Sequence, residues 1–162
     1  MPAAFEFVHE VNFSGPVRTA WEFEHAVVVN APAGTAWEFW TNVENWKFDP
    51  GVEWVRLDGD FRAGAVGEAK QHGQPPLPLR VAEAREPERC VIELDLLYLT
   101  FRLEMNFEPV SGDASRLRQR LTLDAPEDSP FAAGLRPESG DEARAGLKRL
   151  AEAIEKYAAR RG

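Results

Sequence analysis

His25 is the residue of this sequence whose side chain is best suited to move a proton near neutral pH. It lies in the segment WEFEHAVVV, where it alternates in step with Phe23, Val27 and Val29. Residues two apart on a strand share one face, so this pattern places the imidazole among side chains that face the core. A buried imidazole needs hydrogen-bond partners and can act as an acid or a base. His25 is therefore the catalytic candidate, and the alternative is a hydrogen-bonded histidine of the core or of a cavity rim.

Gln119 is a second polar residue on an otherwise apolar strand face. In the segment SRLRQRLTL it alternates with Leu117, Leu121 and Leu123, while three arginines occupy the opposite face. Its amide would form a hydrogen bond with a carbonyl or hydroxyl group of a ligand, or it would hold a buried water molecule. The sequence leaves both interpretations open.

Motifs for metal, phosphate and acyl chemistry are missing from the sequence. The histidines, His9, His25 and His72, match no metal-binding spacing, and neither His-Glu-x-x-His nor Cys-x-x-Cys occurs. The serine elbow Gly-x-Ser-x-Gly is also absent. The glycines within 59–67 lie between two predicted strands, which is typical of turns with positive φ and not of a phosphate loop before a helix. We therefore expect no metal and no cofactor.

The composition is that of a globular domain, with 44% hydrophobic and 28% charged residues among 162. A net charge of -8 would repel a phosphate backbone, so nucleic acid is not an expected partner. No stretch approaches the roughly 20 apolar residues of a membrane span, and the N-terminus lacks the features of a signal peptide. The single cysteine, Cys90, is expected to be inert and cannot form an internal disulfide, which favours a cytoplasmic location.

Hydrophobic periodicity predicts one strand, two short helices, six further strands and one long helix, in that order. The strands are expected at 21–29, 52–58, 65–72, 77–84, 90–97, 99–108 and 115–123, the short helices at 32–43 and 43–47, and the long helix at 141–161. The sixth strand alternates apolar and polar residues, which is typical of an antiparallel sheet with one solvated face. The long helix repeats apolar residues three and four apart, as an amphipathic helix does.

A curved antiparallel sheet with one buried face needs a large cover, and the 141–161 helix is the longest element predicted. The fold class is therefore α+β. The curvature leaves space that side chains fill incompletely, which predicts a cavity between sheet and helix. The residues expected to line it are His25, Trp37, Trp40, Phe101, Met105, Phe107, Gln119, Phe131, Leu147, Leu150 and Ile154. For each apolar residue of the strand and the helices, the alternative is a plain core residue. Phe131 belongs to a long loop at 125–140, which would act as a gate.

Two segments resemble the START-like, or SRPBCC, superfamily and, within it, the polyketide cyclase/dehydrase-like branch. They are VVVNAPAGTAWEFWTNVENWKFDPGVEWVRLDGDFRAGAVG at 27–67 and GLKRLAEAIEKY at 146–157. The resemblance extends over roughly residues 21–160 and implies the helix-grip fold, START/Bet v 1-like, with a seven-stranded curved antiparallel sheet around a long C-terminal helix. It also implies a deep apolar pocket for lipids, polyketides or other aromatic molecules. The superfamily has no shared catalytic motif, so the resemblance assigns no catalytic residue.

The sequence thus predicts one START-like domain at 21–162, preceded by an extension at 1–20. Period-two apolar residues in the extension predict an added edge strand or a contact in a homodimer. The leading hypothesis is a protein that binds a small hydrophobic or aromatic molecule. One alternative is an enzyme of the polyketide cyclase, aromatase or dehydrase type, in which His25 would move protons near an enol. The other is a protein-interaction or stress module without a ligand.

Overall fold

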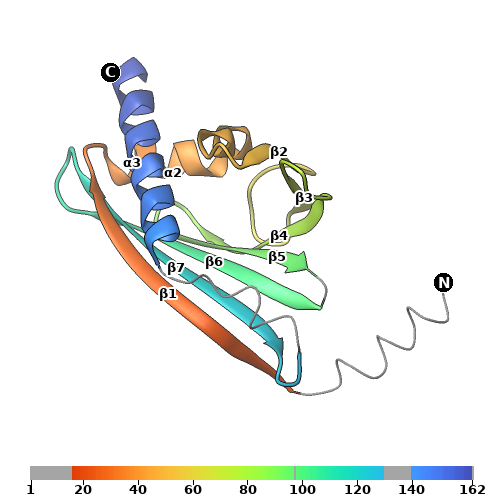
Figure 1. Ribbon diagram of the computed structural model, residues 1–162. Coiled ribbons are helices and arrows are strands. Elements are labelled where there is room, and N and C mark those ends of the chain that lie inside the picture. Colours follow the sequence, from red (N-terminus) through yellow and green to blue (C-terminus); the bar gives the residue numbers. More distant parts are fainter. Residues whose placement is uncertain (1–15, 97, 130–139, 162) are drawn as a thin grey trace.

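The computed structural model describes residues 16–96, 98–129 and 140–161 (Figure 1). The described part of the chain begins with strand β1 (Val17–Val29), followed by helix α2 (Ala33–Thr41) and the short helix η1 (Val43–Phe48). Six strands come next: β2 (Val52–Leu57), β3 (Val66–Gln71), β4 (Leu77–Arg85), β5 (Arg89–Leu96), β6 (Leu99–Pro109) and β7 (Ser115–Pro126). Helix α3 (Asp141–Arg161) is the last described element. The predicted order of elements is confirmed.

The strands form one seven-stranded sheet in the order β1-β7-β6-β5-β4-β3-β2. All neighbouring strands are antiparallel. At one edge of the sheet, β1 pairs with β7 along its length. β1 starts at Val17, four residues before the predicted start, and Val17 pairs with Pro126. Of the predicted N-terminal extension, residues 17–20 thus belong to β1, while residues 1–15 lie outside the described residues.

Helix α3 lies against the curved sheet near β1, with α2 close to its C-terminal half (Figure 1). Its buried residues are Leu147, Leu150, Ala151 and Ile154, whose three- and four-residue spacing forms the predicted apolar stripe. The lower part of β1, β7 and β6 extends beyond α3 in Figure 1. The helix therefore covers one end of the sheet more fully than the other.

Among the described residues, the buried hydrophobic side chains form two separate clusters. The larger one joins α2, η1 and α3 to the sheet and contains Met105, Phe107 and Ile154. The smaller one lies on the strand ends beyond α3 and is formed by Trp21, Leu99, Leu123 and Ala125, with partly buried neighbours such as Phe101. The space between helix and sheet is thus lined by apolar residues of both clusters.

The outer face of the sheet contains a network of ion pairs between arginines and carboxylates. Arg80 donates to Glu93 at 2.8 Å and to Asp95 at 2.6 Å, and Arg102 contacts Glu93 at 3.0 Å and Asp124 at 2.7 Å. Glu93 and Asp95 thus lie on the outward face, where strand alternation puts them. Partly exposed pairs of this kind contribute little stability each, so their main effect is to keep this face hydrated.

Candidate ligand-binding site

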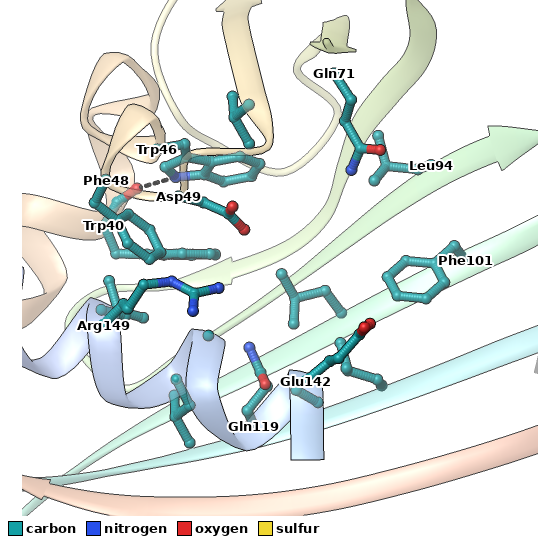
Figure 2. Close-up of a pocket in the computed structure, with 17 residues that line it drawn as sticks. Trp40, Trp46, Phe48, Asp49, Gln71, Leu94, Phe101, Gln119, Glu142 and Arg149 are labelled. Atoms are coloured by element: carbon teal, nitrogen blue, oxygen red, sulfur yellow. Dashed lines mark hydrogen bonds between the residues drawn. The ribbon is translucent and has the colours of Figure 1, made fainter. Parts of the chain in front are cut away.

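A cavity of about 240 Å³ lies between the inner face of the sheet and the N-terminal half of α3 (Figure 2). Strands β5, β6 and β7 contribute Leu94, Phe101, Leu103, Gln119 and Leu121. Helix α3 contributes Glu142, Ala143, Gly146, Leu147, Arg149 and Leu150. Trp40, Trp46, Phe48, Asp49, Val52 and Gln71 complete the wall.

The sheet residues of this wall are less buried than their neighbours on the same strands. On β6, Phe101 and Leu103 are half-buried, whereas Met105 and Phe107 are 0% and 2% exposed. On β7, Leu121 is half-buried and Leu117 is fully buried. Apolar surface that the protein leaves uncovered is available to stabilise a bound apolar molecule.

One end of the cavity is formed by aromatic rings that the short helices hold in place. Trp40 and Trp46 stack with ring centroids 4.6 Å apart, and the Trp46 indole N–H donates to the carbonyl of Trp40 at 2.9 Å (Figure 2). Phe48 lies beside them and is half-buried against Phe39, with centroids 6.5 Å apart. Because the stack and its hydrogen bond join α2 to η1, this wall is formed before any ligand binds.

Polar side chains from four different elements also line the cavity. Figure 2 shows Gln119 and Arg149 pointing into the space between the tryptophans and Phe101. Asp49 accepts the backbone N–H of Gly51 at 2.8 Å, which closes the turn after η1. Within the described ranges, the side chains of Gln119 and Arg149 form no hydrogen bond or ion pair with the protein. Their donors and acceptors are therefore free for a ligand.

The structure brings five of the predicted lining residues together on the cavity: Trp40, Phe101, Gln119, Leu147 and Leu150. Four others lie elsewhere. Met105, Phe107 and Ile154 are part of the larger core cluster, and Trp37 is buried with its indole N–H donating to Glu86 at 3.1 Å. Phe131 and most of its 125–140 loop lie outside the described residues.

Sequence reasoning missed the aromatic residues of η1 and most of the polar wall. Trp46 and Phe48 are absent from the predicted lining residues, yet they form one end of the cavity. Arg149 directly precedes Leu150 on α3, but adjacent residues on a helix face different directions, so its position contains no clear signal for the cavity. For Gln71, at the end of β3, strand periodicity alone contains no such signal.

His25 lies under the start of α3 and not on the cavity wall. Its ring is stacked on Phe23 with centroids 6.3 Å apart, and a Cβ added at Gly140 would lie 3.0 Å from His25 Cε1. Its Nε2 is buried and has no hydrogen-bond partner in the described structure. Burial, and secondarily the positive charge of Arg144, lowers the pKa of His25. The neutral imidazole therefore serves the packing of α3 on β1.

We expect the His25→Gln variant to lose part of the protein's pH-dependent stability. Because the folded-state pKa lies below the usual 6.5, the unfolded chain binds the proton first as the pH falls. The contribution of His25 is thus complete above pH 6.5 and declines below it. Urea denaturation at pH 7.5 and 5.5 should show a smaller drop in the free energy of unfolding for His25→Gln than for the unchanged protein. The exposed His72 provides the control: His72→Gln should keep the full drop, and an equal effect of both variants would contradict the assignment.

Cys90 is buried in the larger core cluster. Desolvation raises the pKa of its thiol to about 12. A thiol that stays protonated at neutral pH is a poor nucleophile, so Cys90 is a packing residue.

Fold and cavity together define a helix-grip protein with a space of about 240 Å³ between its sheet and its C-terminal helix. Residues 20–155 match the model of the family described as polyketide cyclase / dehydrase and lipid transport. The chain belongs to this family, and the START-like prediction is confirmed.

Several solved structures share the fold. Norcoclaurine synthase from Thalictrum flavum is 13% identical, with a TM-score of 0.65 over 90% of this chain and 98% of that chain. A START superfamily protein from Mycobacterium smegmatis is 16% identical, with a TM-score of 0.62 over 87% of this chain and 99% of that chain. The di-domain ARO/CYC BexL from the BE-7585A biosynthetic pathway is 21% identical, with a TM-score of 0.64 over 83% of this chain and 46% of that chain. At these identities the likeness shows the fold alone, and a comparison with curated protein sequences finds no match.

Metal sites and membrane spans each require features of their own. The described residues contain no group of three or more His, Cys, Asp or Glu side chains placed to hold a metal ion. Within the same ranges, none of the helices combines the length and the hydropathy needed to cross a membrane.

Proposed function

We propose that the protein binds a small hydrophobic or aromatic molecule in the cavity between the sheet and α3. The observation that carries this proposal is the set of half-buried apolar side chains, Leu94, Phe101, Leu103 and Leu121, around a space with free polar groups. Covering apolar surface contributes roughly 25 cal/mol per Å², so a ligand that closes this space gains several kcal/mol before the costs of binding.

Next to the cavity, on the side away from the C-terminal end of α3, lies a second hollow of about 260 Å³. Gln71, Leu94 and Phe101 line both spaces, and the second is closed by Trp21, Leu77, Leu96 and Leu123. A molecule longer than a single ring could therefore occupy the cavity and the second hollow together, with its middle against Phe101. The amides of Gln71 and Gln119 are placed to orient a carbonyl or hydroxyl group.

The relatives are consistent with this class of ligand. Norcoclaurine synthase has been determined in complex with dopamine and hydroxybenzaldehyde, which are both small aromatic molecules. The family description names polyketide chemistry and lipid transport. Both support an apolar or aromatic ligand for this chain.

A cyclase- or dehydrase-type enzyme is the second candidate, because the carboxylates of Asp49 and Glu142 line the same apolar cavity. General acid–base catalysis needs a titratable group within reach of the substrate, and here that group would be a carboxylate and not His25. Deuterium exchange at the central carbon of a bound β-diketone, faster than in buffer and lost in Glu142→Gln or Asp49→Asn, would favour the enzyme over a binding protein.

Gly146→Leu is expected to block ligand binding while the protein remains folded. Gly146 lies on the cavity wall in the N-terminal half of α3. A Cβ added there would contact the Arg149 guanidinium at 3.8 Å and would clash with none of the described residues. The leucine side chain would therefore occupy the cavity. Replacing a helical glycine also stabilises the helix by up to about 1 kcal/mol. Fluorescence titration with N-phenylnaphthylamine should show affinity reduced at least about ten-fold, since displacing the ligand forfeits more than about 1.4 kcal/mol of apolar contact.

Gly146→Ala is the matched control for this experiment. Its single methyl group should give the same helix stabilisation while leaving most of the cavity open, so N-phenylnaphthylamine should still bind. Saturable binding that is unchanged in Gly146→Leu would place the ligand elsewhere. The absence of binding in the unchanged protein would contradict the proposed function.

A further inference from the structure

The cations of this chain differ in how they are paired. On the outer face of the sheet, arginines such as Arg80, Arg102 and Arg120 contact carboxylates at 2.6–2.7 Å. At the edge between η1 and α3, Lys47, Arg149, Lys156 and Arg160 form no ion pair with any described residue. These side chains are therefore available to pair with a ligand, although the chain as a whole carries a net charge of -8.

Three of these cations line a groove of about 300 Å³ between η1 and α3. Lys47, Lys156 and Arg160 contribute the positive charge, and Glu44 is the one carboxylate among its lining residues. Phe39, Phe48 and Tyr157 supply aromatic surface. We call this hollow the cationic groove. Ammonium and guanidinium groups bind oxyanions through charge-assisted hydrogen bonds, so an excess of them favours an anion.

The cationic groove adjoins the ligand cavity. Phe48 lines both spaces. On α3, Gly146 and Arg149 face the cavity, and Lys156 and Arg160 line the groove. Successive members of this series are three, seven and four residues apart, so they lie along one side of the helix. Arg149 and Lys156 are seven residues apart, which corresponds to about 10 Å along a helix axis. One flexible molecule can therefore reach from the cavity into the groove.

Building on the proposed function, we propose that the cationic groove binds the anionic group of an amphiphilic ligand. The apolar part of the ligand enters the cavity past Phe48, and its phosphate, sulfonate or carboxylate group lies between Lys47, Lys156 and Arg160. Arg149 carries a positive charge at the cavity wall between the two ends. The ligand class is then an elongated amphiphilic anion and not a neutral hydrocarbon.

The test compares two fluorescent probes that differ in one charge, dansylaminoundecanoate and its methyl ester. At low ionic strength the acid should bind more tightly than the ester. The double variant Lys156→Gln/Arg160→Gln should weaken binding of the acid about five-fold, since exposed charge pairs are worth roughly 1 kcal/mol or less and are screened by salt. It should leave the affinity for the ester unchanged.

The matched control is Arg62→Gln/Lys148→Gln, which removes the same charge at exposed positions that line neither the cavity nor the groove. It should leave the affinity for both probes unchanged. Equal weakening of acid binding by the two double variants would contradict the groove as the site of the anionic group. Dodecyl phosphate should displace the acid at concentrations where inorganic phosphate does not; equal displacement would reveal a separate anion site and overturn the proposal.

The two hypotheses fail in different ways. If neither the ester nor N-phenylnaphthylamine binds, the cavity proposal is wrong and the groove proposal falls with it. If the ester binds but the acid is not favoured, the cavity stands and the groove assignment alone is wrong.

Discussion

Phe107→Ala is expected to lower the free energy of unfolding by about 3–5 kcal/mol, as deletion of a buried aromatic ring usually does. Phe107 is 2% exposed and its ring meets Trp37 edge-on, with centroids 5.4 Å apart. It lies where β6 packs against α2, inside the larger core cluster. Removal of the ring leaves a cavity that the close-packed surroundings fill incompletely. Urea denaturation followed by tryptophan fluorescence measures the loss.

Phe101→Ala is the informative comparison, because Phe101 is on the same strand and the same face. It is half-buried on the wall of the ligand cavity, so its removal should cost about 1–2 kcal/mol, with less contact to lose. It should weaken binding of N-phenylnaphthylamine, whereas folded Phe107→Ala should bind it normally. A larger binding defect in Phe107→Ala would show that the ligand site lies in the core cluster and not at the cavity.

Gly67→Ala is expected to destabilise the protein by about 3 kcal/mol, near the upper end for an overpacked site. A Cβ at Gly67 would lie 1.9 Å from the carbonyl oxygen of Arg56 and 2.9 Å from Leu57 Cα. Both clashes are with backbone atoms, so β2 itself must move, and its pairing with β3 is weakened. Because η1 and the aromatic end of the cavity precede β2 directly, we also expect weaker ligand binding.

Gly34→Ala is the control for the glycine experiment. Gly34 is in the first turn of α2, and a Cβ there would meet nothing within 4 Å. Alanine should be neutral or stabilising by up to about 1 kcal/mol. Urea denaturation of both variants under one condition measures the free energy of unfolding. Similar losses in the two variants would mean that the close approach of β2 does not restrict Gly67.

The glycines within 59–67 show what a local sequence pattern can and cannot predict. The sequence predicts positive φ for the series within 59–67, and Gly59 and Gly64 indeed have φ of 98° and 92°. Gly67 is different, since it lies inside β3 opposite Leu57 and is required by the approach of a neighbouring strand. A turn is a local feature, so sequence can predict it; a close approach depends on the pairing of two strands.

The sequence by itself determined the order of elements, the faces of the strands and the apolar stripe of α3. These follow from periodicity, because a side chain's face depends on its neighbours two, three or four residues away. The alternation within β6 alone therefore assigns Phe101, Met105 and Phe107 to one face.

Which of these inward residues line a cavity was decided by the tertiary structure. Phe101 and Phe107 share a face, but α2 covers the sheet at Phe107, whereas Phe101 is half-buried on the cavity wall. His25 and Gln119 are direct partners in the β1–β7 register, yet the start of α3 covers His25 while Gln119 lines the cavity. Strand periodicity is the same for both members of each pair. The difference arises from where a helix distant along the chain comes to rest on the sheet.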